Sequence, residues 1–161
     1  MKTKNLLLTI CLLCGSLAHA QNSTMNKLFD KYENEDDITV ISISKAMFKM
    51  IPGNIYTDNV DLKSILHKIE SMRLIRSNKT DLRKKMHSDF KSLIDKDKNY
   101  EELVRIRDGK TTVTFNARKS GTLINELIML VNEEENFVAI QILGNFTLEE
   151  IQEITKDRNT Q

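Results

Sequence analysis

The chain has 161 residues, with 24 basic and 23 acidic side chains and a formal net charge of +1. Such an even balance disfavours nucleic acid and anionic lipid as partners, because both require a concentrated positive surface. The length is that of one ordinary domain, and it is sufficient to bury a hydrophobic core without disulfides or metals.

The first twenty residues are typical of a secretory signal peptide. Lys2 and Lys4 precede an apolar run, Leu6–Leu13, that is too short to span a bilayer. Ala18-His19-Ala20 then offers a small-x-small cleavage site. We therefore expect a signal peptide over residues 1–20 and an exported protein, periplasmic or secreted after cleavage near Ala20/Gln21.

Cleavage at that site leaves a single domain over residues 21–161, which has 22 basic and 23 acidic side chains. Both cysteines, Cys11 and Cys14, lie in the signal peptide, so the exported domain has neither a disulfide nor a thiolate zinc site. A lipoprotein signal needs a small residue directly before the acylated cysteine, whereas Ile10 and Leu13 occupy those positions. We expect neither a membrane span nor a lipid anchor.

Helices and strands alternate in the first part of the domain. Ser23 is placed to cap a helix whose apolar face is formed by Met25, Leu28, Phe29 and Tyr32. The β-branched, alternating segment Ile38–Ile43 predicts a strand. A second helical face follows at Ala46, Met47, Met50 and Ile51, and Pro52-Gly53 ends it.

The next segments predict a helix, a strand and a longer helix. Asp61 is placed to cap a short helix that carries Leu62, Ile65, Leu66 and Ile69, and residues 72–76 predict a strand. Thr80 opens the clearest helix of the chain. Its apolar positions are Leu82, Met86, Phe90, Leu93 and Ile94, and its polar positions are Arg83, Lys84, Lys85, Lys91 and Asp95.

The C-terminal third predicts four consecutive antiparallel strands. Leu103–Arg107 and Thr111–Ala117 alternate on either side of Asp108-Gly109, which is a strong hairpin signal. Leu123–Val131 is too apolar for an edge strand and is therefore expected at the centre of the sheet, and Phe137–Leu143 is the fourth strand.

Thr147 and Glu150 fit a capping box that opens a closing helix, with Leu148, Ile151 and Ile154 facing inward. The fold class predicted from these elements is α+β. It is a mainly antiparallel sheet with a C-terminal four-strand meander, covered by helices.

Residues with catalytic or metal-binding potential are few. His67 and His87 are twenty residues apart and match no metal-binding spacing, so solvent-facing or boundary positions are expected for both. There is no serine elbow, and the oxygen-rich segment Asp95–Asn99 lacks the glycine and glutamate of a calcium loop. We predict no catalytic residue, no metal and no cofactor.

Two surface features have alternative interpretations. A basic group is either a binding surface for an acidic partner or, more commonly, a solvated helix end. Its members are Arg73, Arg76, Lys79, Arg83, Lys84 and Lys85. The methionines are either core residues or the lining of an adaptable groove, and core is the expected role. They are Met47, Met50, Met72, Met86 and Met129.

The chain resembles the domain-of-unknown-function 4252 family, small exported proteins found mainly in Bacteroides-like bacteria. The resemblance covers nearly all of residues 25–155, and four segments carry it: Ile38–Met50, Leu103–Gly109, Glu126–Val131 and Phe137–Gly144. It implies export and an unassigned function, and it transfers no catalytic residue. Many members are lipid-anchored, and this chain departs from them because it lacks a suitable acylation sequence.

The functional hypothesis is a non-enzymatic module of the cell envelope that binds another protein or a peptide. Export, a sheet-rich fold and the scarcity of catalytic groups support it, and an edge strand such as Leu103–Arg107 could accept an added strand. The alternative is a small-ligand-binding protein or a hydrolase with a site dispersed over the fold. His67, His87 and nearby carboxylates would be its acid–base groups.

Overall fold

A computed structural model describes residues 23–51, 56–57, 60–61 and 66–150. The predicted signal peptide, the Pro52-Gly53 break and the inward-facing Ile151 and Ile154 lie outside these residues. The elements in chain order are α2 (Thr24–Glu33), β1 (Thr39–Ser44), α3 (Lys45–Met50), β2 (Tyr56–Thr57), β3 (Val60–Asp61), β4 (Ile69–Ser77), α5 (Thr80–Lys96), β5 (Tyr100–Asp108), β6 (Thr111–Ser120), β7 (Leu123–Asn132) and β8 (Phe137–Phe146).

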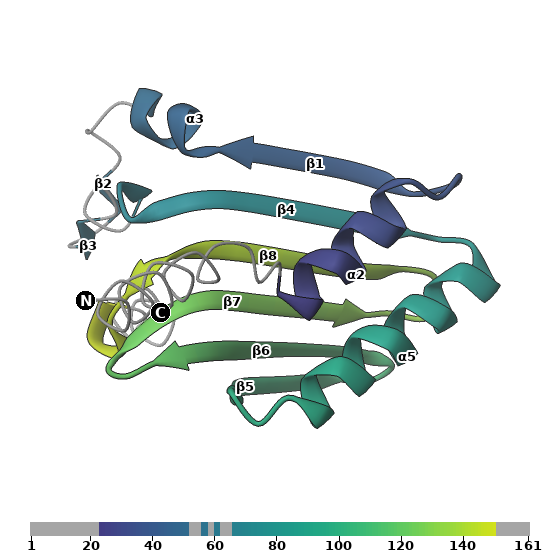
Figure 1. The fold of residues 1–161 in the computed structure, drawn as a ribbon. Coiled ribbons are helices and arrows are strands. Elements are labelled where there is room, and N and C mark those ends of the chain that lie inside the picture. The colour runs from purple at the N-terminus through teal and green to yellow at the C-terminus, as the bar shows by residue number, and fades with distance from the viewer. Residues whose placement is uncertain (1–22, 52–55, 58–59, 62–65, 151–161) are drawn as a thin grey trace, which may run out of the picture.

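The fold is built on a six-stranded antiparallel sheet, and α2 and α5 cross one of its faces (Figure 1). The strand order is β1-β4-β8-β7-β6-β5, while β2 and β3 form a separate two-stranded ladder. The predicted α+β class is therefore confirmed. The C-terminal meander β5 to β8 is also confirmed, and β7 lies beside β8 at the centre of the sheet, as its apolar sequence predicts.

The turns of the meander follow from local sequence. Gly109, between β5 and β6, has a φ of 54°, and Gly121, between β6 and β7, has a φ of 65°. Glycine adopts this left-handed region without the steric penalty that a Cβ atom introduces. These two turns set the pairing of β5 with β6 and of β6 with β7.

The main core lies between the two helices and the sheet. Ser23 caps α2 by accepting a hydrogen bond from the Asn26 backbone N–H at 3.1 Å, as predicted. The rings of Phe29 on α2 and Phe90 on α5 meet edge to face, with centroids 5.1 Å apart. The buried side chains of this core are Met25, Phe29, Tyr32, Ile75, Met86, Phe90, Ile128, Leu130, Phe137 and Ala139, so the apolar stripes predicted for α2 and α5 are confirmed.

We call the face of the sheet that points away from α2 and α5 the far face. Because side chains alternate between faces along a strand, the strand register aligns the far-face residues in rows across the sheet. The first row takes one apolar residue from each strand: Ile41, Leu74, Ile140, Met129, Phe115 and Val104. The second row runs from Arg76 through Val138, Val131, Val113 and Ile106. The third row contains Ile43, Met72, Ile142, Leu127 and Ala117.

A second hydrophobic cluster packs on the third row at one end of the far face. Phe48 of α3 joins Ile69, Ile124 and Phe146 there, and Leu148 contacts the cluster. The apolar face predicted at Ala46, Met47, Met50 and Ile51 is wrong in part. Met47 and Met50 are 56% and 74% exposed, whereas Ile51, directly after the helix, packs against the cluster. The helix is only six residues long and continues directly from β1, so a single large side chain reaches the cluster.

The segment around Asp61 also differs from the prediction. Asp61 belongs to β3 rather than to a helix cap, and Ile69 begins β4, where it pairs with Gly144. Leu66 contacts the second cluster, while Leu62 and Ile65 lie outside the described residues. The apolar spacing is compatible with a helix, but the β-branched Ile69 is held by a strand partner that is distant in sequence.

The capping box after β8 is confirmed. The Thr147 backbone N–H donates to Glu150 Oε2 at 2.9 Å, and the Glu150 N–H donates to Thr147 Oγ1 at 3.3 Å. Lys68 forms an ion pair with Glu150, which links this turn to the start of β4. Among the described residues, no helix has the length and apolar character needed to cross a membrane.

Gly144 lies within β8 at a position where the chain approaches itself closely. A Cβ atom there would lie 2.4 Å from Phe146 Cζ and 2.5 Å from the Lys68 carbonyl oxygen. The Asn145 N–H donates to the same carbonyl at 3.4 Å. Glycine is therefore required at this position by the second cluster and by the turn before β4.

Replacing this glycine is expected to weaken the fold. Gly144→Ala should lower the free energy of unfolding by about 1–3 kcal/mol, because both the ring and the backbone must shift. Urea denaturation followed by circular dichroism measures the change. Gly121→Asn is the control, since asparagine tolerates a positive φ and the added atom meets nothing within 4 Å. Equal stability of Gly144→Ala and the wild type would contradict this account.

Candidate functional site

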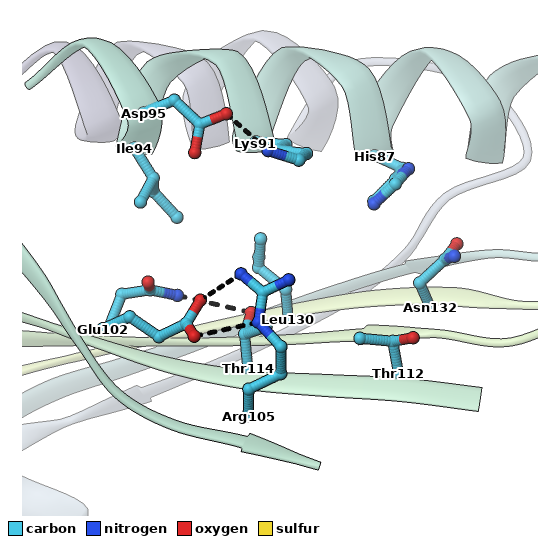
Figure 2. Close-up of a pocket in the computed structure, with 11 residues that line it drawn as sticks. His87, Lys91, Ile94, Asp95, Glu102, Arg105, Thr112, Thr114, Leu130 and Asn132 are labelled. Atoms are coloured by element: carbon cyan, nitrogen blue, oxygen red, sulfur yellow. Dashed lines mark hydrogen bonds and ion pairs between the residues drawn. The ribbon is translucent and has the colours of Figure 1, made fainter. Parts of the chain in front are cut away.

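A small polar pocket lies between α5 and the outer strands of the sheet (Figure 2). Its volume is about 70 Å³, which is enough for a small side chain or roughly two water molecules. The residues that line it are His87, Lys91, Ile94, Asp95, Glu102, Arg105, Thr112, Thr114, Asn116, Leu130 and Asn132.

One wall of the pocket comes from α5. His87, Lys91 and Asp95 are four residues apart and therefore share one side of the helix. Lys91 Nζ and Asp95 Oδ2 form an ion pair at 2.5 Å. The His87 ring lies 5.7 Å from the Phe137 ring, and burial, together with the charge of Lys91, lowers the pKa of His87 below its usual value.

The opposite wall comes from β5 and β6. Arg105 Nε and Nη2 donate to the two carboxylate oxygens of Glu102, at 2.8 and 2.5 Å. These hydrogen bonds lower the pKa of Glu102. Asn116 donates to Thr114 Oγ1 at 3.3 Å. Both acidic side chains of the pocket are thus paired with a cation, and the pocket has no net charge apart from that of His87.

The acid–base groups considered in the hydrolase hypothesis do not converge. His87 lines the pocket, whereas His67 is exposed in the turn before β4 and is not among the lining residues. Within the described part of the chain, no hydrogen bond joins His87 to a carboxylate that would orient its ring. An oriented imidazole is what general-base catalysis requires.

The described residues also contain no candidate metal site, because no group of three or more His, Cys, Asp or Glu side chains converges on one point among them. The oxygen-rich segment Asp95–Asn99 forms the end of α5 and the turn to β5. Asp97 accepts hydrogen bonds from the backbone and side chain of Asn99, at 3.0 and 2.7 Å, which lowers the pKa of Asp97. Arg118 lies 3.4 Å from the Asp97 carboxylate. Asp97 thus has a structural role in this turn.

A buried polar network on the same face of the sheet was not predicted from the sequence. Tyr100 of β5 donates its phenol hydrogen to Glu126 Oε2 of β7 at 2.7 Å, and Gln141 of β8 donates to the other carboxylate oxygen. Glu126 is 3% exposed and Gln141 is 1% exposed. Burial and the neighbouring carboxylate raise the pKa of Tyr100.

The network extends from the sheet to α2. Gln141 accepts hydrogen bonds from Arg73 Nε and Nη2, at 2.9 and 2.8 Å, and donates to Asn26 at 2.8 Å. Arg73 Nη1 also donates to Asp30 on α2 at 2.7 Å. The only sequence signal was the presence of Glu126 and Gln141 inside otherwise apolar strands, because their partners are distant along the chain.

The predicted basic group does not form one surface. Arg73 is held in the buried network, Arg76 donates to Asn136, and Lys79 lies 3.7 Å from Asp37. Arg83, predicted on the solvated side of α5, donates to the Glu133 carbonyl at 3.1 Å. Only Lys84 and Lys85 project from α5 as exposed neighbours. The group therefore supplies intramolecular contacts rather than a continuous positive patch.

The strand β5 is at once a wall of the pocket and an edge of the sheet. It pairs with β6 on one side, and no strand among the described residues lies on its other side.

The model of one protein family, described as Domain of unknown function (DUF4252), matches residues 32–154. The chain belongs to the DUF4252 family. The match extends over every strand of this DUF4252 domain and over the whole pocket, and no curated protein and no solved structure matches the chain.

The buried network of this DUF4252 member generates a stability prediction. Tyr100→Phe should lower the free energy of unfolding by about 1.5–3 kcal/mol, because a buried carboxyl group loses a hydrogen bond that water cannot replace. Tyr32→Phe is the matched control. Tyr32 donates to Asp89, whose side chain is 35% exposed and therefore accessible to water. Tyr32→Phe should thus lower the free energy of unfolding by about 1 kcal/mol or less. Urea denaturation of both variants at pH 7 tests the ranking, and equal losses would contradict it.

The pocket histidine generates a pH prediction. Because the pKa of His87 is lower in the folded chain than the ordinary value of 6.5, the stability that it contributes is present above pH 6.5. That contribution is lost as the pH falls through the folded-state pKa. We expect the stability of the wild type relative to His87→Gln to decrease between pH 7 and pH 5, measured by urea denaturation. His67→Gln should retain the wild-type decline, and a decline that persists in His87→Gln would disprove the assignment.

Proposed function

We propose that this DUF4252 member is an exported, non-enzymatic module of the cell envelope that binds an extended segment of another protein along β5. The observation that carries the proposal is that no strand of the described residues pairs with the outer edge of β5, which also forms the polar pocket with α5. The N-terminal sequence supports export to the periplasm or beyond, as a signal peptide over residues 1–20 would direct.

The edge of β5 has the properties of a strand acceptor. An edge strand presents alternate backbone N–H and C=O groups outward, and an added peptide pairs with them through main-chain hydrogen bonds. The pairing of β5 with β6 is irregular between Glu102 and Val104, so the regular acceptor is the segment Val104–Asp108. Val104 and Ile106 are 39% and 51% exposed on its far-face side.

The two sides of β5 predict the kind of peptide. Side chains of an added strand that point to the far-face side would lie beside Val104 and Ile106, which favours apolar residues. Side chains on the other side would lie beside Arg105 and the pocket under α5. Because the pocket charges are already paired, this position favours a small, uncharged polar side chain.

The other edge of the sheet is less suited to this role. β1 has six residues, compared with nine in β5, and it continues directly into α3. The pocket under α5 is not formed by β1. Glu102 and Asp95 are each ion-paired with a cation of the pocket, which supports binding rather than catalysis at β5.

The proposal predicts position-specific capture of a partner. A photo-crosslinking amino acid at Arg107, exposed at the regular end of β5, should yield one dominant cross-linked protein in the envelope of the native cells. The same amino acid at Ser42 is the control, because that residue is exposed on β1, at the opposite edge of the sheet from β5. The cross-linked products are identified by mass spectrometry.

Identical products at Arg107 and Ser42, or no product above background at Arg107, would refute strand addition at β5. A further variant tests the pocket. Thr112→Val removes a hydroxyl that lines the pocket and that forms no side-chain hydrogen bond with the described residues, so it should weaken capture at Arg107 without unfolding the chain.

A further inference from the structure

The far face presents an apolar surface that neither buried cluster includes. The first row places an apolar side chain on every one of the six strands, and the second row places one on four of them. None of these residues belongs to the core beneath α2 and α5 or to the cluster around Phe48. At the outer strands, Ile41 is 46% exposed and Ile106 is 51% exposed.

The charge pattern of this surface restricts what it could contact. The only charged side chain in these two rows is Arg76, at one corner, where it donates to Asn136 at 2.7 Å. The remaining positions are aliphatic or aromatic, which excludes a phosphate-rich or strongly charged partner as the main occupant. Rows of apolar side chains on a sheet instead fit another apolar sheet face, as in two sheets packed about 10 Å apart.

The dimensions of the surface also restrict the occupant. Six strands about 4.8 Å apart and two rows about 7 Å apart give a flat area on the order of 400 Å². The largest exposed apolar patch of a typical monomer is about 300–600 Å² and is often functional.

We propose that the far face packs against the far face of a second copy of this chain. The two copies would together bury on the order of 1,000 Å² when the exposed Met50 of α3, at the end of the face, is included. This area is close to the lower limit for a specific interface, so the dimer is expected to dissociate in the micromolar range. The pairing is isologous, because the same rows are contributed by both copies.

The proposed dimer does not depend on the proposed function. Face-to-face packing uses side chains of the far face, and it leaves the outward backbone groups of β5 free for an added strand. Failure of the dimer would leave strand addition at β5 intact, and failure of peptide capture would leave the dimer intact.

Two adjacent residues of β1 provide a matched test. Ile41 points to the far face, and Val40 points to the helix-covered face, because it pairs with the buried Ile75. Both are exposed, at 46% and 38%, so a glutamate at either position should be tolerated by the fold. Ile106→Glu extends the test to the opposite edge of the far face.

The experiment is sedimentation equilibrium of the exported chain, purified without detergent, from about 1 to 100 µM. The wild type and Val40→Glu should reach twice the monomer mass, whereas Ile41→Glu and Ile106→Glu should raise the dissociation constant at least about tenfold. Circular dichroism of each variant verifies folding. A monomeric wild type at 100 µM, or equal effects of Val40→Glu and Ile41→Glu, would overturn the proposal.

Discussion

The register of the antiparallel sheet is the constraint on which the remaining structure depends. In each strand, successive side chains point to opposite faces, so the pairing of Leu74 with Ile140 and of Met129 with Phe115 assigns every neighbouring residue to a face. A slip of one residue would place Ile128 and Ala139 on the far face and expose the core beneath α2 and α5. The positions of the helices, the polar network and the pocket all follow from this assignment.

The helix-covered face combines apolar and polar packing. Phe29 and Phe90 fill the space between α2 and α5, while Glu126, Gln141 and Arg73 form a hydrogen-bonded connection between the sheet and α2. A buried polar group is costly when it lacks partners, and these groups have several. The network therefore specifies how α2 lies on the sheet, which nonspecific apolar contacts alone would leave less well defined.

The two sides of β5 give the proposed function its physical basis. On one side the strand is held by β6, and its Glu102–Arg105 ion pair closes a pocket against α5. On the other side its backbone faces outward, and the irregular pairing near Glu102 confines the regular edge to the segment that ends at Asp108. Irregular pairing and charged side chains limit uncontrolled pairing at sheet edges. A short regular segment of β5 beside such features therefore favours binding of a defined partner over aggregation.

Features with a local cause could be predicted from the sequence. The cap at Ser23, the capping box at Thr147, the hairpin glycine at position 109 and the apolar stripe of α5 each depend on residues within one or two turns of the chain. The central place of β7 was also predictable, because a strand with so few polar positions is unsuited to the unpaired edge of a sheet. The orientation of α3 was not predictable, because its six residues carry several apolar side chains. Only tertiary contacts determine that Phe48 is the one buried in the second cluster.

What the sequence by itself determined is thus the α+β class, the order of most elements and the resemblance to a family with no assigned activity. Only the tertiary structure decided that β1 and β4 extend the sheet beside β8 and that His67 and His87 lie apart. It also decided that Tyr100 meets Glu126 and that Gly144 meets the Lys68 carbonyl. These contacts join residues separated by tens of positions, and their free energy depends on geometry that no local pattern of residues encodes.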